Sequence, residues 1–211
     1  MVAEVEATYA ETRSETGLAA MSPAVRAALG KVERHRLVPP AQTGAAYRNH
    51  PLPIGAGQTI SQPYIVALSA DLLEPKPGDV VLEVGTGSGY QAAVLAEVVK
   101  QVYSIELIES LGTAAAARLR EMGYRNVEVR IGDGYAGWPE KAPFDGIVVT
   151  AAAPQVPPAL VAQLKPGGRM VIPVGGSDEM QYLKLLVKRA DGSYDEKRVL
   201  PVRFVPLVPK K

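Results

Sequence analysis

The middle of the chain alternates short apolar runs with segments of helical periodicity. The apolar runs lie at 80–84, 101–106, 126–130, 144–150 and 169–174. The helical patterns between them lie at 88–99, 109–122 and near 157–165. Runs that are apolar on both faces are typical of strands buried between two layers of helices. The pattern therefore predicts an α/β fold with a doubly wound, mostly parallel sheet.

The last part of the chain has a different pattern. Two strand-like runs, 180–189 and 194–208, flank Ala190-Asp191-Gly192-Ser193, a sequence that favours a tight turn. We therefore expect an antiparallel hairpin at the C-terminal end of the sheet.

The residues before position 79 predict helical additions. Helices are expected to begin at Ser22-Pro23 and run through about Arg36, and to begin again at Ser61. The segment 37–60 between them is rich in proline and glycine and is predicted to be long and irregular. Residues 1–20 read as an arm that is either helical or partly disordered.

One domain over 1–211 accounts for this organisation. Within it, we expect an N-terminal arm over 1–20, helices and a substrate loop over 21–78, a cofactor-binding core over 79–176, and a C-terminal β-hairpin over 177–211.

Composition narrows the classes of function. The chain has 211 residues, no cysteine and a net charge of +1, so thiol chemistry is excluded and nothing draws it toward nucleic acid. No apolar run is long enough for a membrane helix, and an acidic N-terminus is unlike a signal peptide. His35 and His50 have no companions at metal-ligand spacing, so we expect no metal site. A cytoplasmic protein without membrane or nucleic-acid partners is predicted.

A glycine-rich turn follows the first core strand. Gly85, Gly87 and Gly89 have the spacing G-x-G-x-G, whereas a dinucleotide fingerprint needs its third glycine where this chain has Tyr90. Glu83 would repel a pyrophosphate, but it suits a ligand that carries an ammonium and a sulfonium. S-adenosylmethionine is such a ligand; the alternative is a turn that serves packing alone.

Two further acidic positions follow the next strands. Glu106 ends the second core strand, where doubly wound folds place an acid for ribose hydroxyls, although a solvated strand end is the alternative. Gly132-Asp133-Gly134 follows the third and could admit an adenine ring, or form a simple turn. All three features belong to the carboxyl edge of the sheet, where they would form one crevice.

Several motifs resemble the protein-L-isoaspartate O-methyltransferase family. They run in the family's order over most of the chain: VERHRLVP at 32–39, AYRNHPLPIG at 46–55, GQTISQPY at 57–64, GDGYAGWPEKAPFD at 132–145, LKPGGRMVIPVGG at 164–176 and RFVPLV at 203–208. The resemblance implies a Rossmann-like class I methyltransferase fold. It also implies methyl transfer from S-adenosylmethionine to the α-carboxylate of L-isoaspartyl, and to D-aspartyl, residues of damaged proteins, with S-adenosylhomocysteine as product. A monomer is expected.

The resemblance also carries site residues. It implies a catalytic role for Ser61, which would aim the substrate carboxylate; spacing alone equally allows a helix N-cap. The implied cofactor contacts are Thr59, Ile60, Glu83, Gly85, Thr86, Gly87, Ser88, Gly89, Glu106, Gly132, Asp133, Gly134 and Gln181. Residues 205–207 resemble the strand that borders the peptide groove, although an apolar core strand explains them nearly as well.

Two other functions remain open from the sequence. One is a methyltransferase for nucleic acid or a small molecule, but amino-methylating enzymes carry an Asn/Asp-Pro-Pro-aromatic motif where this chain has Thr150-Ala151-Ala152-Ala153-Pro154. The other is a binding module that has lost catalysis, against which the intact GQTIS motif argues.

Overall fold

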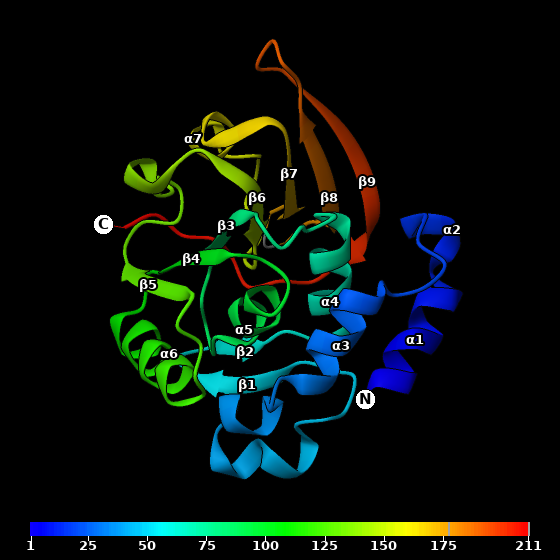
Figure 1. The fold of residues 1–211 in the computed structure, drawn as a ribbon, viewed down its shortest axis with the longest axis vertical. Helices are drawn as coiled ribbons and strands as arrows, with labels where there is room; N and C mark the ends of the chain where they lie inside the picture. The colour runs from blue at the N-terminus through cyan, green and yellow to red at the C-terminus, as the bar shows by residue number, and fades with distance from the viewer. Residues whose placement is uncertain (177, 211) are drawn as a thin grey trace.

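The computed structural model describes residues 1–176 and 178–210, and a seven-stranded sheet forms its centre (Figure 1). The strand order is β5-β4-β3-β6-β7-β8-β9. The parallel strands are β3 (Val80–Val84), β4 (Gln101–Glu106), β5 (Val127–Ile131), β6 (Phe144–Val149) and β7 (Leu164–Val174). The antiparallel hairpin β8 (Gln181–Lys188) and β9 (Tyr194–Val202) completes the sheet. The predicted doubly wound sheet and hairpin are confirmed.

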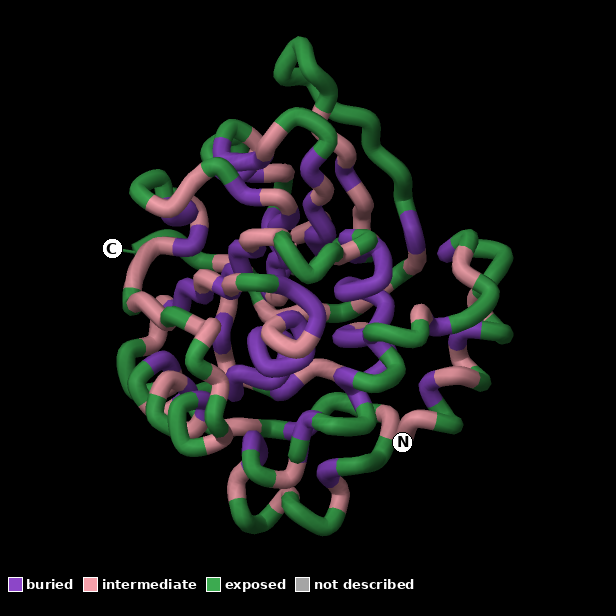
Figure 2. The backbone as a smooth tube through the Cα atoms, in the orientation of Figure 1, coloured by how far each residue is buried: buried purple, intermediate pink, exposed green. Residues whose placement is uncertain are grey.

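Helices cover the two faces of the sheet unequally. On one face lie α3 (Pro23–Lys31), α4 (Pro63–Leu72), α5 (Tyr90–Ala96) and α6 (Glu109–Glu121). The other face is covered by α7 (Pro158–Ala162), the 3₁₀ turn η3 (Pro139–Lys141) and Trp138. Neighbouring residues such as Val81 and Leu82 belong to the two separate apolar clusters, as strand alternation requires. Figure 2 shows the buried centre and the exposed tip of the β8–β9 hairpin.

The N-terminal arm is helical. It forms α1 (Val2–Glu11) and α2 (Arg13–Thr16), and Val5 and Tyr9 are fully buried. The Tyr9 hydroxyl donates a hydrogen bond of 2.6 Å to the Asp71 carboxylate on α4. The packed-helix alternative for the arm is therefore confirmed, and partial disorder is wrong.

The first predicted helix starts as expected and ends early. Ser22 caps α3 by accepting a hydrogen bond from the Val25 N–H at 3.2 Å, and Pro23 occupies the first turn. The helix ends at Lys31 rather than near Arg36, because the next residues form the tighter 3₁₀ turn η1 (Arg34–Leu37).

The segment 37–60 is more regular than predicted. It contains the 3₁₀ turn η2 (Pro40–Ala45) and an antiparallel hairpin of β1 (Leu52–Gly55) and β2 (Gln58–Ile60). Gly55, Ala56 and Gly57 all have positive φ, which lets the hairpin reverse tightly. The irregular-loop prediction is wrong here because two very short strands carry no readable alternation. The hairpin delivers residues 59–61 to the start of α4.

Two strand boundaries also differ from the prediction. Strand β7 begins at Leu164 rather than at 169 and pairs with β6 through a register shift. Strand β9 ends at Val202. Residues 203–208, which we call the closing segment, continue past it and pair with Ala152 instead.

Candidate functional site

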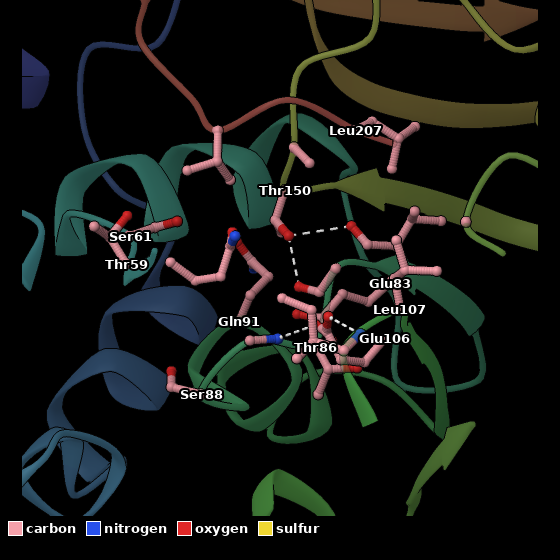
Figure 3. A pocket seen from close by; sticks show the side chains of 18 of the residues that line it. Thr59, Ser61, Glu83, Thr86, Ser88, Gln91, Glu106, Leu107, Thr150 and Leu207 are labelled. Atoms are coloured by element: carbon pink, nitrogen blue, oxygen red, sulfur yellow. Dashed lines mark hydrogen bonds between the residues drawn. The ribbon is translucent and has the colours of Figure 1, made fainter. Parts of the chain in front are cut away.

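The crevice at the glycine turn, which we call the main cleft, opens at the carboxyl ends of β3 and β4 (Figure 3). Because β4 and β6 flank β3 on opposite sides, this is the point where the chain order of the sheet reverses. Ligands of doubly wound folds bind at such points. The cleft has a volume of about 840 Å³, which includes space open to solvent. It is lined by segments 58–61, 83–88, 105–108, 150–151 and 205–208, with Val66, Tyr90, Gln91 and Gly134.

The glycine turn is held against the end of β6. Gly85, Gly87 and Gly89 all have positive φ, as a tight strand-to-helix turn requires. A Cβ added at Gly85 would overlap with Thr150 Oγ1, which donates a hydrogen bond of 2.6 Å to the Gly85 carbonyl. The turn therefore needs glycine for both conformation and space.

Glu83 is a buried carboxylate with an unused oxygen. One oxygen accepts a hydrogen bond from Ser104, whose hydroxyl lies 2.5 Å from that of Thr86. The other, Oε1, is buried without a partner among the described residues. Burial raises the pKa of Glu83 to about 8, although the Ser104 hydrogen bond opposes the rise; the charge of Glu106 adds to it, and the backbone N–H of Ala92 opposes it weakly. A cationic ligand would complete this site.

Glu106 lies on the other side of the turn. Its Oε2 accepts a hydrogen bond of 2.8 Å from the Gly87 N–H, and its Oε1 accepts one of 2.9 Å from the Ile108 N–H. The residue is buried, so the solvated strand end is wrong. Each oxygen keeps a further lone pair with which it could accept a hydroxyl from a ligand.

Ser61 lies at the rim of this cleft and does not cap α4. The N-cap of that helix is Gln62, and no side-chain capping bond is present. Within the described residues, the Ser61 hydroxyl has no hydrogen-bond partner, so it is available to a ligand. The capping alternative is wrong because Pro63 is the first residue of the helix, so the cap position falls on Gln62, one residue after Ser61.

A second cavity, the side groove, opens next to the main cleft and has a volume of about 1280 Å³, which includes space open to solvent. It is lined by Thr8, Pro51, Thr59, segments 61–62, 64–65 and 200–205, and Thr150. Both cavities share Thr59, Ser61, Thr150 and Val205, which we call the junction residues. In Figure 3, Thr59 and Ser61 lie to the left, Glu106 and Leu107 to the right, and Thr150 above and between them.

The structure brings most of the predicted site residues to these cavities, but not all. Those lining the main cleft are Thr59, Ile60, Ser61, Glu83, Gly85, Thr86, Gly87, Ser88, Glu106 and Gly134. Gly89, Gly132, Asp133 and Gln181 do not line it.

Those four residues have other contacts. Gly89 packs close to Leu119, and the Gly132 N–H donates to the Glu106 carbonyl. Asp133 Oδ1 accepts a hydrogen bond of 2.9 Å from the Tyr135 N–H, which closes its own turn. Gln181 bonds to the backbone of the closing segment.

Sequence reasoning missed several lining residues. Thr150 stood out only as a departure from another motif, yet it lies at the junction of both cavities. Gln91 and Val66 gave no signal, because they read as ordinary positions inside helices. The helical arm contributes Thr8 to the side groove, which nothing in its composition indicated.

The described residues contain neither a metal-binding cluster nor a membrane-spanning helix. No cluster of three or more His, Cys, Asp or Glu side chains could hold a metal ion there. Likewise, no helix in 1–176 or 178–210 combines the length and apolar character needed to cross a bilayer.

Comparisons with known proteins agree with one another. The model of the protein-L-isoaspartate(D-aspartate) O-methyltransferase family matches residues 9–211. Protein-L-isoaspartate O-methyltransferase 1 of Cupriavidus necator is 59% identical over 210 residues, which cover 100% of this chain and 81% of the relative. Its namesake in Nitrosospira multiformis is 64% identical over 183 residues, 87% of this chain and 78% of the relative.

Solved structures are similar over nearly the whole chain. A protein-L-isoaspartate O-methyltransferase superposes with a TM-score of 0.81 at 29% identity, covering 98% of this chain and 65% of that one. A structure from Plasmodium falciparum, in complex with S-adenosyl-L-homocysteine, has a TM-score of 0.77 at 24% identity and covers 97% of both chains. At that identity, the second likeness supports the fold alone.

Proposed function

Because this chain belongs to the protein-L-isoaspartate(D-aspartate) O-methyltransferase family, we propose that its main cleft takes the methyl donor and its side groove the damaged protein segment. The chain is an S-adenosylmethionine-dependent enzyme that methylates L-isoaspartyl residues of proteins. The observation that carries the assignment of the two cavities is their junction at Thr59, Ser61, Thr150 and Val205, where a donor and an acceptor could meet.

The residues of the main cleft fit S-adenosylmethionine. The unpartnered Oε1 of Glu83 suits the ammonium of the donor, and Glu106 suits two ribose hydroxyls. A Cβ at Gly134 would stand only 2.5 Å from Val84 Cγ1, so there is no room for a side chain at this position of the cleft wall. The bound donor would supply a methyl group on a sulfonium, which is already a strong electrophile. We propose that Thr59, Ile60, Thr86, Gly87 and Ser88 complete the pocket.

The acceptor needs positioning more than activation. A carboxylate is ionised at neutral pH, so no general base is required, and orientation can supply most of the acceleration. We assign Ser61 to this task because its hydroxyl has no other partner among the described residues and faces both cavities. An acceptor oxygen would form a bond to the methyl carbon while the carbon–sulfur bond breaks and its electron pair stays on sulfur.

The product has a defined fate. A methyl ester is a better leaving group than a carboxylate, so the next backbone nitrogen can close a succinimide and release methanol. Hydrolysis of that ring returns some normal aspartate. The same site is proposed to accept the side-chain carboxylate of D-aspartyl residues. A cytoplasmic location, a monomeric state and a single domain over 1–211 stay predictions.

Methylation of an amine is a weaker candidate. Enzymes of that class present a polar side chain after the fourth core strand to hold the amine. Here the residue at that place is Thr150, whose hydroxyl donates to the Gly85 carbonyl and is thereby engaged in holding the turn. A net charge of +1 also gives no broad attraction to nucleic acid.

A pair of peptides tests the proposed function. The purified protein should transfer labelled methyl groups from S-adenosylmethionine to a short peptide with one isoaspartyl residue. A peptide of the same sequence with normal aspartate should stay unlabelled, because the β-linked backbone changes where the free α-carboxylate lies. Equal labelling of both peptides, or of neither while S-adenosylhomocysteine still binds, would refute the assignment.

A further inference from the structure

The closing segment, residues 203–208, borders both cavities although it belongs to no regular strand. Residues 203–205 line the side groove, and residues 205–208 line the main cleft. Strand β9 ends at Val202, so the ladder of the sheet does not hold this segment. Its position must therefore come from a small number of specific contacts.

One end of the closing segment is anchored next to the main cleft. The Ala152 N–H donates to the Val205 carbonyl at 2.8 Å, and the Leu207 N–H donates to the Ala152 carbonyl at 2.7 Å. The Tyr135 hydroxyl adds a bond of 3.2 Å to the Leu207 carbonyl. These bonds hold the residues that face the proposed methyl donor.

The other end is anchored by the side chain of Gln181. Its Oε1 accepts a hydrogen bond of 2.6 Å from the Phe204 N–H, and its Nε2 donates one of 3.3 Å to the Phe204 carbonyl. This pair of bonds reproduces what a neighbouring strand would offer to Phe204. Gln181 pairs with Val202 in the sheet, so its side chain extends the pairing beyond the end of β9.

The surroundings of Gln181 favour this task over contact with a ligand. The residue is only 5% exposed and lines neither cavity. Gly175 packs against it so closely that an added Cβ would stand 2.9 Å from Gln181 Cα. Both polar atoms of the side chain bond to Phe204, and the one N–H and one lone pair that remain belong to a residue that lines neither cavity.

We propose that Gln181 is a positioning residue for methyl transfer, which acts through the Phe204 backbone to hold the groove side of the closing segment. This inference rests on the proposed function of the side groove. Loss of the anchor frees Arg203 and Phe204, which line the side groove next to Val205, while Ala152 still holds Val205 and the donor side. The acceptor peptide then loses its alignment with Ser61, but the donor keeps its pocket.

Gln163 offers a matched control on the same protein. It is also a buried glutamine, and its side chain accepts a bond of 2.7 Å from the Trp138 N–H and donates one of 2.8 Å to the Ala136 carbonyl. It lines neither cavity. Substitution at Gln163 therefore removes the same kind of two-bond anchor from residues 136–138, which line neither cavity.

The test compares Gln181→Leu, Gln181→Glu and Gln163→Leu with the wild type on an isoaspartyl peptide at saturating S-adenosylmethionine. For Gln181→Leu we expect kcat/KM to fall by about 10- to 30-fold, since two hydrogen bonds are lost. The Kd of S-adenosylhomocysteine, measured by calorimetry, should change by less than about twofold. Gln181→Glu keeps an acceptor for the Phe204 N–H and should recover part of the loss. Gln163→Leu should lose stability and retain its kcat/KM.

Amide exchange of Phe204 adds a readout that global stability does not control. Its protection should fall in Gln181→Leu and persist in Gln163→Leu. A weaker Kd for S-adenosylhomocysteine with unchanged peptide kinetics would overturn the proposal and make Gln181 a donor contact. Equal kinetic losses in both Leu variants would also overturn it. If instead the wild type fails to methylate the isoaspartyl peptide, the proposed function fails, whatever the variants do.

Discussion

The two sides of the junction are built differently. On the proposed donor side, which is the main cleft around the glycine turn, Glu83, Thr86 and Ser88 are buried, and a chain of hydrogen bonds links Glu83 to Ser104 and Thr86. On the proposed acceptor side, which is the side groove, Thr59 is exposed, Ser61 is half-buried, and the closing segment is held by isolated anchors. The donor side is therefore already formed without a ligand, whereas on the acceptor side the Ser61 hydroxyl has no hydrogen-bond partner among the described residues.

This difference suits the two ligands. A methyl donor is one small molecule of fixed shape, so a preformed pocket of local turns can match it. Damaged proteins vary around the isoaspartyl residue, and a groove with a few fixed points tolerates that variation. Substitutions should consequently damage the donor side through packing and strain, and the acceptor side through lost orientation.

The largest effect is expected on the donor side, from Gly85→Ala. The new Cβ would overlap with Thr150 Oγ1 at a φ of 98°. We expect the free energy of unfolding to fall by about 3 kcal/mol, the sum of backbone strain and overpacking. Binding of S-adenosylhomocysteine should weaken by at least about tenfold, since the turn moves. Chemical denaturation and calorimetry measure the two losses.

A glycine of the acceptor side provides the contrast. Gly57 also has positive φ, at 70°, but a Cβ there would meet nothing within 4 Å. Gly57→Ala should cost only the strain of the left-handed conformation, about 1–2 kcal/mol, and leave donor affinity unchanged. If Gly57→Ala weakens the donor as much as Gly85→Ala does, the two sides are not independent.

The same difference explains how much the sequence could predict. The glycine turn, Glu83 and Glu106 lie at strand ends. Their placement therefore follows from the positions of the strands along the sequence and from the rule that ligands of parallel sheets bind at the carboxyl ends of the strands. The junction depends on where distant segments come together: the β1–β2 hairpin, the end of β6 and the closing segment. A local sequence pattern does not indicate which distant segments will be in contact.

Individual residues show the same limit. Spacing could not separate a capping role from a catalytic one for Ser61, because a shift of one residue in the helix start decides between them. Gln181 was expected at the donor, whereas its amide bonds to the Phe204 backbone. That partner lies 23 residues along the chain and on another segment, so no motif near Gln181 could indicate it.

The variant Ser61→Ala is expected to have the next largest effect, and it tests the acceptor side alone. We expect kcat for the isoaspartyl peptide to fall by about 10- to 100-fold, the worth of one hydrogen bond to a charged group. Because Ser61 makes no capping bond, the Tm should stay within about 2 °C of the wild type, and donor affinity should hold. Initial rates, calorimetry and thermal unfolding check this. A lower Tm with unchanged kcat would return Ser61 to a structural role.

Over a single pH unit, the smallest of these effects concerns the charge of Glu83, which makes the donor side but not the acceptor side depend on pH. Its pKa of about 8 in the free protein lies above the ordinary carboxyl value of 4.5 because the side chain is buried. The stability that protonated Glu83 gives is fully present below the unfolded pKa and is lost as pH rises through 8. A cationic donor favours the ionised form, so binding should release a proton below pH 8.

Affinity for S-adenosylhomocysteine should therefore rise with pH between about 6 and 8, by at most tenfold per unit, and level off above. Glu83→Gln has no proton to release, and its affinity should be weaker and nearly independent of pH over this range. Calorimetry in two buffers of different ionisation enthalpy counts the released proton directly. Peptide KM at saturating donor should show no such slope, since Ser61 and the closing segment contribute no group that titrates there. Equal slopes for the wild type and Glu83→Gln would show that another group, and not the buried carboxylate, links donor binding to pH.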